Sequence, residues 1–512
     1  MENTISRTEK VKNPSKVFLA LDSFFHFTER KTTLKSEFGA GISGFLVAIA
    51  AFIMNAYVIG GVYGNYAGSY LAVSLLAFTG TLLLGIFTNR PLIQCSNLAL
   101  ASTMVSMVSA YNGLTYSNML MITFLSSLLY LIIVLTPLGK KVSSLLPLSV
   151  KKSLPIGIGL FTIIECLSYA GILNNNGLKQ IGEFSMQGCY LLMMLIALIV
   201  YIAFRILKVR KSALHIFLAL IGLMWAFGIL FFGNEFIGGQ TAATIVYQRL
   251  NVFFATDGAS PYNIALGFKS VDWFGCFRNG FDFTALIENG GSPALVIIKG
   301  IIVFLGLSLA TNDATLRAVG TTGEFVDKNM NVAEEKRVFL INSTTNVIAP
   351  IFGAPIQTIS SSSSVMTNDE GKTGFSSLIC SLGFLLCTFT WFFFGIFATE
   401  THGVGMWIEH SEIKLASYVQ DVFAFSCLIV ALTSSRMLNG IRNINFKDAE
   451  EVIPFIATLV GIVALKDIAF GMSLGVISDL LCKLILKKKV EDKIGSCSLS
   501  LLSLVYLVFA II

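Results

Sequence analysis

Two charged residues stand inside an otherwise apolar segment, at a spacing that would let them act together. Asp313 and Arg317 lie in GLSLATNDATLRAVG (306–320). An i, i+4 spacing places both side chains on one face of a helix. A buried carboxylate is costly in a bilayer, so it usually faces a cavity and marks the path of a ligand or an ion. The pair predicts either a substrate anchor or proton carrier at Asp313, with Arg317 as counter-charge or gate, or a structural ion pair that holds this helix to its neighbours.

Two stretches far apart in the chain share a second pattern. PLIQCSNLALAS (91–102) and APIQTISSSSSVM (354–366) both place an Ile-Gln pair beside a proline and continue with small or polar residues. Because proline removes a backbone donor, we expect each stretch to begin extended and to start a half-helix near the membrane centre. Extended backbone at that depth is tolerated only where it is buried in protein or lines a cavity.

The half-helices would supply polar groups to a substrate. Their N-termini, near Asn97 and Ser361, would offer free N–H groups and the positive end of the helix dipole. The serines add short hydroxyls that can cap the helix and let a flat ligand approach. The alternatives are a Ser-rich linker and close helix packing through small residues. The predicted substrate-binding residues are Asp313, Ser360, Ser361, Ser362, Ser363, Asn97, Gln94 and Gln357, with Asp313 and Arg317 as proton-coupling or gating residues.

The remaining reactive side chains show no catalytic or metal-binding pattern. The nine cysteines are scattered without CxxC spacing, and the four histidines are isolated. GKTG (371–374) lacks the spacing of a phosphate loop, so it predicts a cytoplasmic turn. We therefore expect no enzyme, no cofactor, no metal and no nucleic-acid partner.

The elements that would position these residues are membrane helices. The 512 residues are 54% hydrophobic and 13% charged, with a mean hydropathy of +0.76, whereas a soluble domain carries roughly 25% charged residues. About 20 apolar residues span a bilayer as a helix. Fourteen segments qualify, and the apolar tail at 497–512 either lies in the interface or forms one more span. The segments are 38–62, 68–87, 91–110, 117–137, 153–174, 187–206, 211–233, 296–320, 337–353, 355–368, 375–398, 416–436, 452–467 and 469–486.

Basic residues predict the orientation. Lys and Arg cluster in the N-terminal arm and in alternate loops, which places the N-terminus in the cytoplasm. A long loop at 234–292 would then lie outside and separate two halves of seven spans. Because seven is odd, repeated halves would be inverted in the membrane, as in many secondary transporters.

Four blocks of the sequence are similar to one transporter family. They are SFFHFTERKTTLKSEFGAGISGFL (23–46), KKSLPIGIGLFTIIECLSYAGI (151–172), KRVFLINSTTNVIAPIFGAPIQTISSSSSVMTNDEGKTG (336–374) and INFKDAEEVIPFIATLVGIVALKDIAFGMSLGVISDLLCKLI (444–485). In this order and spacing they resemble the adenine/guanine/hypoxanthine permease branch of the nucleobase–ascorbate transporter superfamily. The likeness runs from about residue 23 to the end of the chain.

The resemblance implies an all-α polytopic membrane protein with the uracil-permease-like fold, built from two inverted seven-span repeats. Substrate would bind between the broken third and tenth spans and the eighth, and a core domain would move against a gate domain like an elevator. The implied division is 1–37 cytoplasmic arm, 38–137 and 293–400 core, 138–233 and 401–486 gate, 234–292 extracellular loop, and 487–512 apolar tail.

The match is incomplete at the site. Asp313 matches the family's eighth-span acid. Ser362 stands where the family has a glutamate in the tenth span, Ala101 stands where it has an asparagine in the third, and Arg317 stands where it tends to have a small residue. A serine makes weaker hydrogen bonds than a carboxylate, so these departures bear on both substrate and coupling ion.

The resulting hypothesis is a permease that moves a nucleobase, favouring purines, across the plasma or inner membrane. The proton would be the coupling ion, and two chains would pair through their gate domains. The alternatives are an organic or inorganic anion transporter of the same fold and a non-transporting sensor.

Overall fold

A computed structural model describes most of the helical part of the chain. It covers residues 16–63, 66–137, 146–169, 271–327, 330–332, 334–389, 435–464, 468–486 and 493–511, with a few isolated residues between 173 and 207. The predicted span at 211–233, and nearly all of the spans at 187–206 and 416–436, lie outside the described residues.

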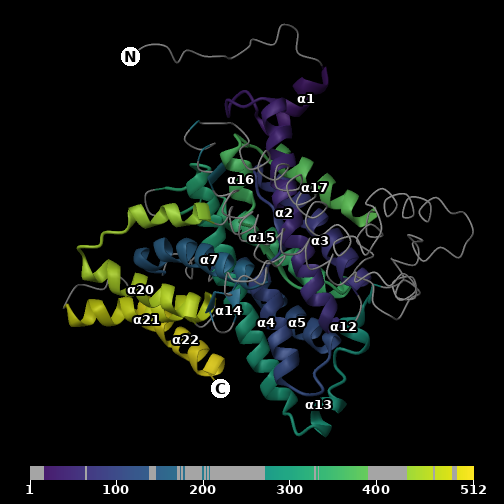
Figure 1. Ribbon diagram of the computed structural model, residues 1–512, viewed down its shortest axis with the longest axis vertical. Coiled ribbons are helices and arrows are strands. Elements are labelled where there is room, and N and C mark those ends of the chain that lie inside the picture. The colour runs from purple at the N-terminus through teal and green to yellow at the C-terminus, as the bar shows by residue number, and fades with distance from the viewer. Residues whose placement is uncertain are drawn as a thin grey trace, which may run out of the picture.

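The described helices form two groups, which are seen side by side in Figure 1. The first group packs α2, α3 and α17 together and adds α4, α5, α14, α15 and α16. The second group packs α7, α20 and α21 together, and α22 lies against α21 and also against α14 of the first group.

The bounds of these elements follow the apolar segments of the sequence. The first group consists of α2 (Leu34–Tyr63), α3 (Tyr66–Thr88), α4 (Leu98–Ala110), α5 (Tyr116–Leu135), α14 (Pro293–Thr322), α15 (Glu335–Ile348), the 3₁₀ turn η1 (Ala349–Phe352), α16 (Ser363–Asn368) and α17 (Gly374–Phe389). The second consists of α7 (Leu148–Tyr169), η3 (Ser435–Asn443), α20 (Ala449–Ala464), α21 (Ile468–Ile485) and α22 (Lys493–Ile511). The short helices α1 (Lys16–Phe25), α12 (Gly275–Arg278) and α13 (Thr284–Glu288) and a hairpin of β2 (Leu173–Asn174) with β3 (Gly177–Leu178) complete the described elements.

Four helices are long and apolar enough to cross a membrane, counting only the residues that the structure describes. They are Gly68–Thr88, Tyr116–Leu135, Pro293–Thr322 and Ile468–Ile485. Two further apolar helices, at Leu100–Ala110 and Gly374–Thr388, are shorter. The chain is thus a helical membrane protein, while the count of fourteen spans and the inverted repeats stay predictions.

Two short strands interrupt the helices at the places where the sequence predicts extended backbone. β1 (Gln94–Ser96) follows Pro91, and β4 (Gln357–Ile359) follows Pro355. The strands pair with each other antiparallel, with Cys95 opposite Thr358. Because α4 continues from β1 and α16 from β4, the two helices leave opposite ends of the strand pair.

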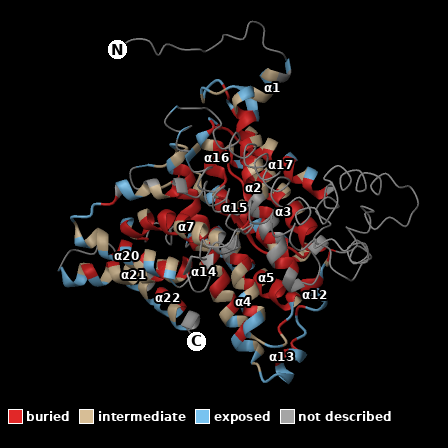
Figure 2. Cartoon of the chain, in the orientation of Figure 1, coloured by how far each residue is buried: buried red, intermediate tan, exposed pale blue. Residues whose placement is uncertain are grey.

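The strand pair lies in the buried part of the first group of helices, in which red, buried segments predominate in Figure 2. Every residue of both strands is buried. The apolar tail, which the sequence left undecided, forms most of α22. Its Tyr506 ring packs closely against Gly306 of α14, and the side chain of Ala469 of α21 lies near the same glycine.

Candidate functional site

Side chains from two helices hold the outer edge of β4. Asn346 of α15 donates to the Gln357 carbonyl over 2.7 Å and accepts from the Gln357 N–H over 2.9 Å. Asn312 of α14 accepts from the Ile359 N–H over 2.9 Å and donates to Asn342 of α15 over 2.7 Å. Buried backbone groups need partners, and here three asparagines replace the strand that a larger sheet would supply.

The outer edge of β1 is satisfied in the same way. Thr81 of α3 accepts from the Gln94 N–H over 3.1 Å and donates to the Gln94 carbonyl over 3.0 Å. Asn55 of α2 donates to the Ser96 carbonyl over 3.0 Å. The strand pair is therefore fixed to α2, α3, α14 and α15 by side-chain hydrogen bonds.

The two predicted site glutamines, Gln94 and Gln357, take part in this fixation. The Gln94 amide donates to Thr345 of α15 over 2.6 Å, and the Gln357 amide donates to the Val73 carbonyl of α3 over 3.0 Å. Both side chains are fully buried. Their Oε1 atoms have no hydrogen-bond partner among the described residues, so each retains one free acceptor.

The serine run forms a turn that joins β4 to α16. The N–H groups of Ser363 and Ser364 donate to the carbonyls of Ser360 and Ser361, and the Ser362 N–H donates to the Ser360 hydroxyl. Ser361 is half-buried, whereas Ser360, Ser362 and Ser363 are buried. Several of the backbone donors that we expected at a ligand are thus bonded within the run itself.

Asn97 lies at the other end of the strand pair, directly before α4. It is half-buried, and its carbonyl accepts from the Ala101 N–H over 3.0 Å. Ala101, which the resemblance places at a polar position of the family, is buried in the apolar core. The structure thus sets Asn97 and the serine run at opposite ends of the strand pair.

Asp313 and Arg317 form the i, i+4 pair that their spacing predicts. Arg317 Nε donates to Asp313 Oδ2 over 2.8 Å, and Nη2 donates to Oδ1 over 2.7 Å. The guanidinium also donates to the Met330 carbonyl and, over 3.3 Å, to Glu335 at the start of α15. Arg317 is 1% exposed and Asp313 is 6% exposed. The carboxylate is therefore neutralised by a buried partner in this structure.

The Asp313–Arg317 ion pair and the contact with α16 lie on different sides of helix α14. Thr322 contacts Thr367 of α16 at 2.9 Å between the hydroxyls, and Gly300 packs against α5 and α4. Thr311 lies 11 residues from Thr322 and 11 residues from Gly300, which is about three helical turns in each direction. The three residues therefore share one face of α14. Asp313 points about 200° around the helix from Thr311. Thr311, and not Asp313, thus lies on the side of the half-helices.

Three buried hydroxyls that the sequence analysis did not select belong to the candidate site. The oxygens of Thr311, Ser308 and Thr358 have no hydrogen-bond partner among the described residues, although the side chains are between 0% and 2% exposed. Buried polar atoms are nearly always bonded, so these oxygens are candidates for a hydrogen bond to a ligand. The one sequence signal was the i, i+3 spacing of Ser308 and Thr311 in SLAT.

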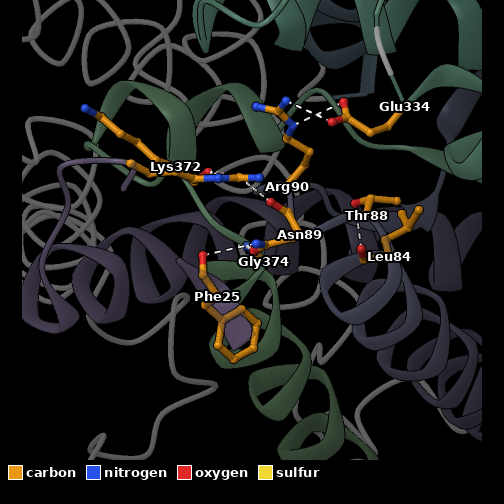
Figure 3. A network of polar contacts seen from close by, with 9 residues as sticks. Phe25, Leu84, Thr88, Asn89, Arg90, Glu334, Lys372 and Gly374 are labelled. Carbon is orange, nitrogen blue, oxygen red and sulfur yellow. Dashed lines mark hydrogen bonds and ion pairs between the residues drawn. The ribbon is translucent and has the colours of Figure 1, made fainter. Parts of the chain in front are cut away.

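A network at one end of the first helix group fixes the chain that enters β1 (Figure 3). Arg90 pairs with Glu334 at 3.0 Å. Asn89 donates to the Phe25 carbonyl over 3.0 Å and accepts from the Gly374 N–H over 2.9 Å. Arg30 donates to the Asn89 carbonyl and, over 2.7 Å, to the Lys372 carbonyl. The N-terminal arm therefore ties the start of β1 to the start of α17.

The predicted turn at GKTG is part of the same region. It connects α16 to α17, and the buried carboxylate of Glu37 accepts from the N–H groups of Lys372 and Thr373, over 2.8 Å and 3.3 Å, and from the Ser376 hydroxyl. Glu37 thus occupies the N-terminus of α17 that an anion could otherwise bind.

Comparison with known proteins finds relatives across most of the chain. No family model matches. The chain is 22% identical over 461 residues to the guanine/hypoxanthine permease PbuO of Bacillus subtilis, covering 89% of this chain and 92% of that one. It is 23% identical over 461 residues to the guanine/hypoxanthine permease GhxP of Escherichia coli O157:H7, covering 89% of each. It is 21% identical over 464 residues to the adenine permease AdeP of Escherichia coli K12, covering 90% and 89%.

Solved structures show a more distant similarity. The transmembrane domain of the cyanobacterial bicarbonate transporter BicA matches 86% of this chain and 97% of its own, with a TM-score of 0.48 and 14% identity.

Proposed function

Because the chain is a divergent relative of the guanine/hypoxanthine and adenine permeases, we propose that it is a secondary transporter that moves a purine, such as adenine, guanine or hypoxanthine, across a cell membrane. The relatives are permeases and not enzymes, and the chain is a multi-pass membrane protein. The observation that carries the proposal is the likeness to purine permeases over about nine-tenths of the chain.

The proposed substrate position is beside the strand pair, between Asn97 and the serine turn and facing Thr311. A purine presents donors and acceptors on the edge of a flat ring. Hydroxyls both donate and accept, so Thr311, Ser308 and Thr358 suit such an edge. In this assignment the ring is bound by neutral hydroxyls and backbone groups, which agrees with the absence of a glutamate at Ser362.

Transport would follow an elevator-type movement of the first helix group against the second. This division assigns α2 to α5 and α14 to α17 to the core, and α7, α20 and α21 to the gate. A substrate bound along the strand pair would travel with the core, because side chains of four core helices hold both strands.

Proton coupling would act through Asp313 and its partner. Arg317 lies between Asp313 and Glu335 and contacts both. Protonation of Asp313 would leave Arg317 with Glu335 as its remaining carboxylate partner and would free α14 to move relative to α7. Since the charge of Arg317 is already compensated by two carboxylates, an anion substrate, which stays the alternative, would have to be bound by helix N-termini and hydroxyls.

Uptake in cells without endogenous nucleobase transporters tests the proposal. We expect saturable uptake of labelled adenine, guanine or hypoxanthine, a smaller response with xanthine and uracil, and loss of uptake in Asp313→Asn. A protonophore should abolish accumulation if protons drive it. Labelled bicarbonate and sulfate serve as the controls for an anion carrier. The proposal would be rejected if correctly inserted protein took up no base at all.

A further inference from the structure

Helix α22 contacts both groups of helices. It packs along α21 of the second group and also against α14 of the first (Figure 1). On its inner side Ser503 and Tyr506 are each 6% exposed, whereas Leu501, Leu502 and Leu504 on its outer side are each more than half exposed. Among the side chains of α22 whose burial is described, Tyr506 is therefore the large one that reaches into the protein.

The Tyr506 ring packs at a place where α14 has no side chain. A Cβ atom added at Gly306 would lie 3.0 Å from the Cε2 atom and 3.1 Å from the Cδ2 atom of the ring, and 3.6 Å from the Cβ atom of Ala469 in α21. A side chain at position 306 would thus have to displace the ring. Helices α14, α21 and α22 meet at this one glycine.

The ring can make this contact at one height along α14. One turn before Gly306, on the same face of the helix, stands Ile302, and one turn after it stands Ala310. Both residues carry a Cβ atom, so neither offers the ring the space that it has at Gly306. A displacement of α14 by one turn, which is about 5.4 Å, would therefore separate the ring from its contact.

The contact lies on the same face of α14 as the buried ion pair. Gly306 and Asp313 are seven residues apart, which places them within about 20° of each other around the helix. Thr311 lies about 140° from Gly306. Helix α22 therefore contacts α14 on the side of Asp313 and away from the side that is proposed to face the substrate.

We propose that α22 is a strap that restrains α14 against α21 in one state of the transport cycle, with the Tyr506 ring as its point of contact. When the first helix group moves past the second, the ring has to leave Gly306, so this contact adds to the barrier for leaving the state. The strap thereby sets the rate of transport without contacting the substrate. This inference rests on the proposed transport function.

A covalent link across the contact tests whether the contact opens during transport. In a background in which the exposed Cys497 is replaced by serine, the double variant Gly306→Cys, Tyr506→Cys should take up labelled purine while it is reduced. A short bifunctional methanethiosulfonate reagent should join the two cysteines and abolish uptake, and dithiothreitol should restore it. The two single cysteine variants, treated in the same way, are the controls. Parental uptake by protein that is fully linked, as measured by mass spectrometry, would overturn the proposal.

Removal of the ring tests its effect on the rate. Tyr506→Ala should raise the maximal rate of purine uptake about five-fold and change KM less than about two-fold, compared at equal amounts of protein in the membrane. Leu502→Ala, on the exposed side of α22, is the matched control and should change neither. A maximal rate of Tyr506→Ala at or below the parental value would contradict the restraint. Absence of uptake in the parent itself would instead reject the proposed function.

Discussion

Ile93 and Ser363 bind each other although they lie 270 residues apart in the chain: the Ile93 N–H donates to the Ser363 hydroxyl over 2.8 Å. The Ile93 carbonyl accepts from the Ser360 N–H, also over 2.8 Å. The serine run therefore connects the two interrupted segments of the fold, and at least one of its hydroxyls is used for that purpose before any ligand arrives.

Replacing that hydroxyl should weaken the fold. Ser363→Ala leaves the buried Ile93 N–H without its acceptor, which should cost about 1–3 kcal/mol and lower the unfolding temperature in detergent. Ser361→Ala is the matched control, because Ser361 is half-buried and, among the described residues, only its backbone carbonyl is bonded. Equal melting temperatures for the two variants would contradict the connecting role.

The hydrogen bonds of Asn346 with β4 can be tested with a substitution that keeps the shape of the side chain. Asn346→Asp retains an acceptor for the Gln357 N–H but places a carboxylate against the Gln357 carbonyl, which now receives no donor from position 346. We expect a loss of a few kcal/mol and reduced purine uptake, measured by thermal unfolding and transport assays. Thr344→Val is the control, because its exposed hydroxyl donates to the Leu340 carbonyl of its own helix.

Removing one charge of the buried pair should be more harmful than removing both. Arg317→Gln leaves Asp313 buried without its cation, which costs about 3–5 kcal/mol. The double variant Asp313→Asn, Arg317→Gln replaces the pair by two amides and should recover part of this stability. A double variant no more stable than Arg317→Gln would contradict a direct pairing energy between the two residues.

The assignment of Thr311 to the substrate predicts an effect on affinity. Thr311→Val keeps the volume and removes the hydroxyl, so KM for purine uptake should rise about ten-fold, the loss of one good hydrogen bond. Thr321→Val on the exposed end of α14 should leave KM unchanged, since that hydroxyl bonds the Arg317 carbonyl. An unaltered KM in Thr311→Val would contradict the binding of substrate by Thr311 and would favour Asp313 as the substrate contact.

Glu37, in the first turn of α2, should contribute to stability by capping α17. Glu37→Gln replaces one carboxylate oxygen by an amide group that cannot accept from the N–H of Lys372 or Thr373, and we expect a loss of about 1–3 kcal/mol in the free energy of unfolding. Glu29→Gln is the control, because that side chain is 80% exposed. A similar small effect in both variants would show that the cap of α17 is not important for stability.

The extended backbone segments at the site and the ion pair on α14 could be predicted from the sequence. Proline beside an Ile-Gln pair predicted the extended segments, and both strands are present at those positions. The i, i+4 spacing predicted the contact of Asp313 with Arg317. These features depend on residues near each other in sequence, so local rules were sufficient.

The side chains that hydrogen-bond those segments could not be predicted from the sequence. Nothing near Gln357 indicates that Asn346 and Asn312 will hold its strand, since asparagine is common in loops and turns. Thr311 was missed for a related reason. A charge in an apolar segment draws attention to Asp313, while the face of α14 that meets α16 depends on tertiary packing, as the contact of Thr322 with Thr367 shows.

The pairing of β1 with β4 also has a consequence for biosynthesis. When a ribosome has completed β1, the strand that covers its inner edge has not been made, and Ile93 still lacks Ser363. The first half of the chain must therefore wait in the membrane with exposed backbone groups until the second half is inserted. A chain truncated after α5 should be a target for membrane quality control, and co-expression of the missing half should protect it from degradation.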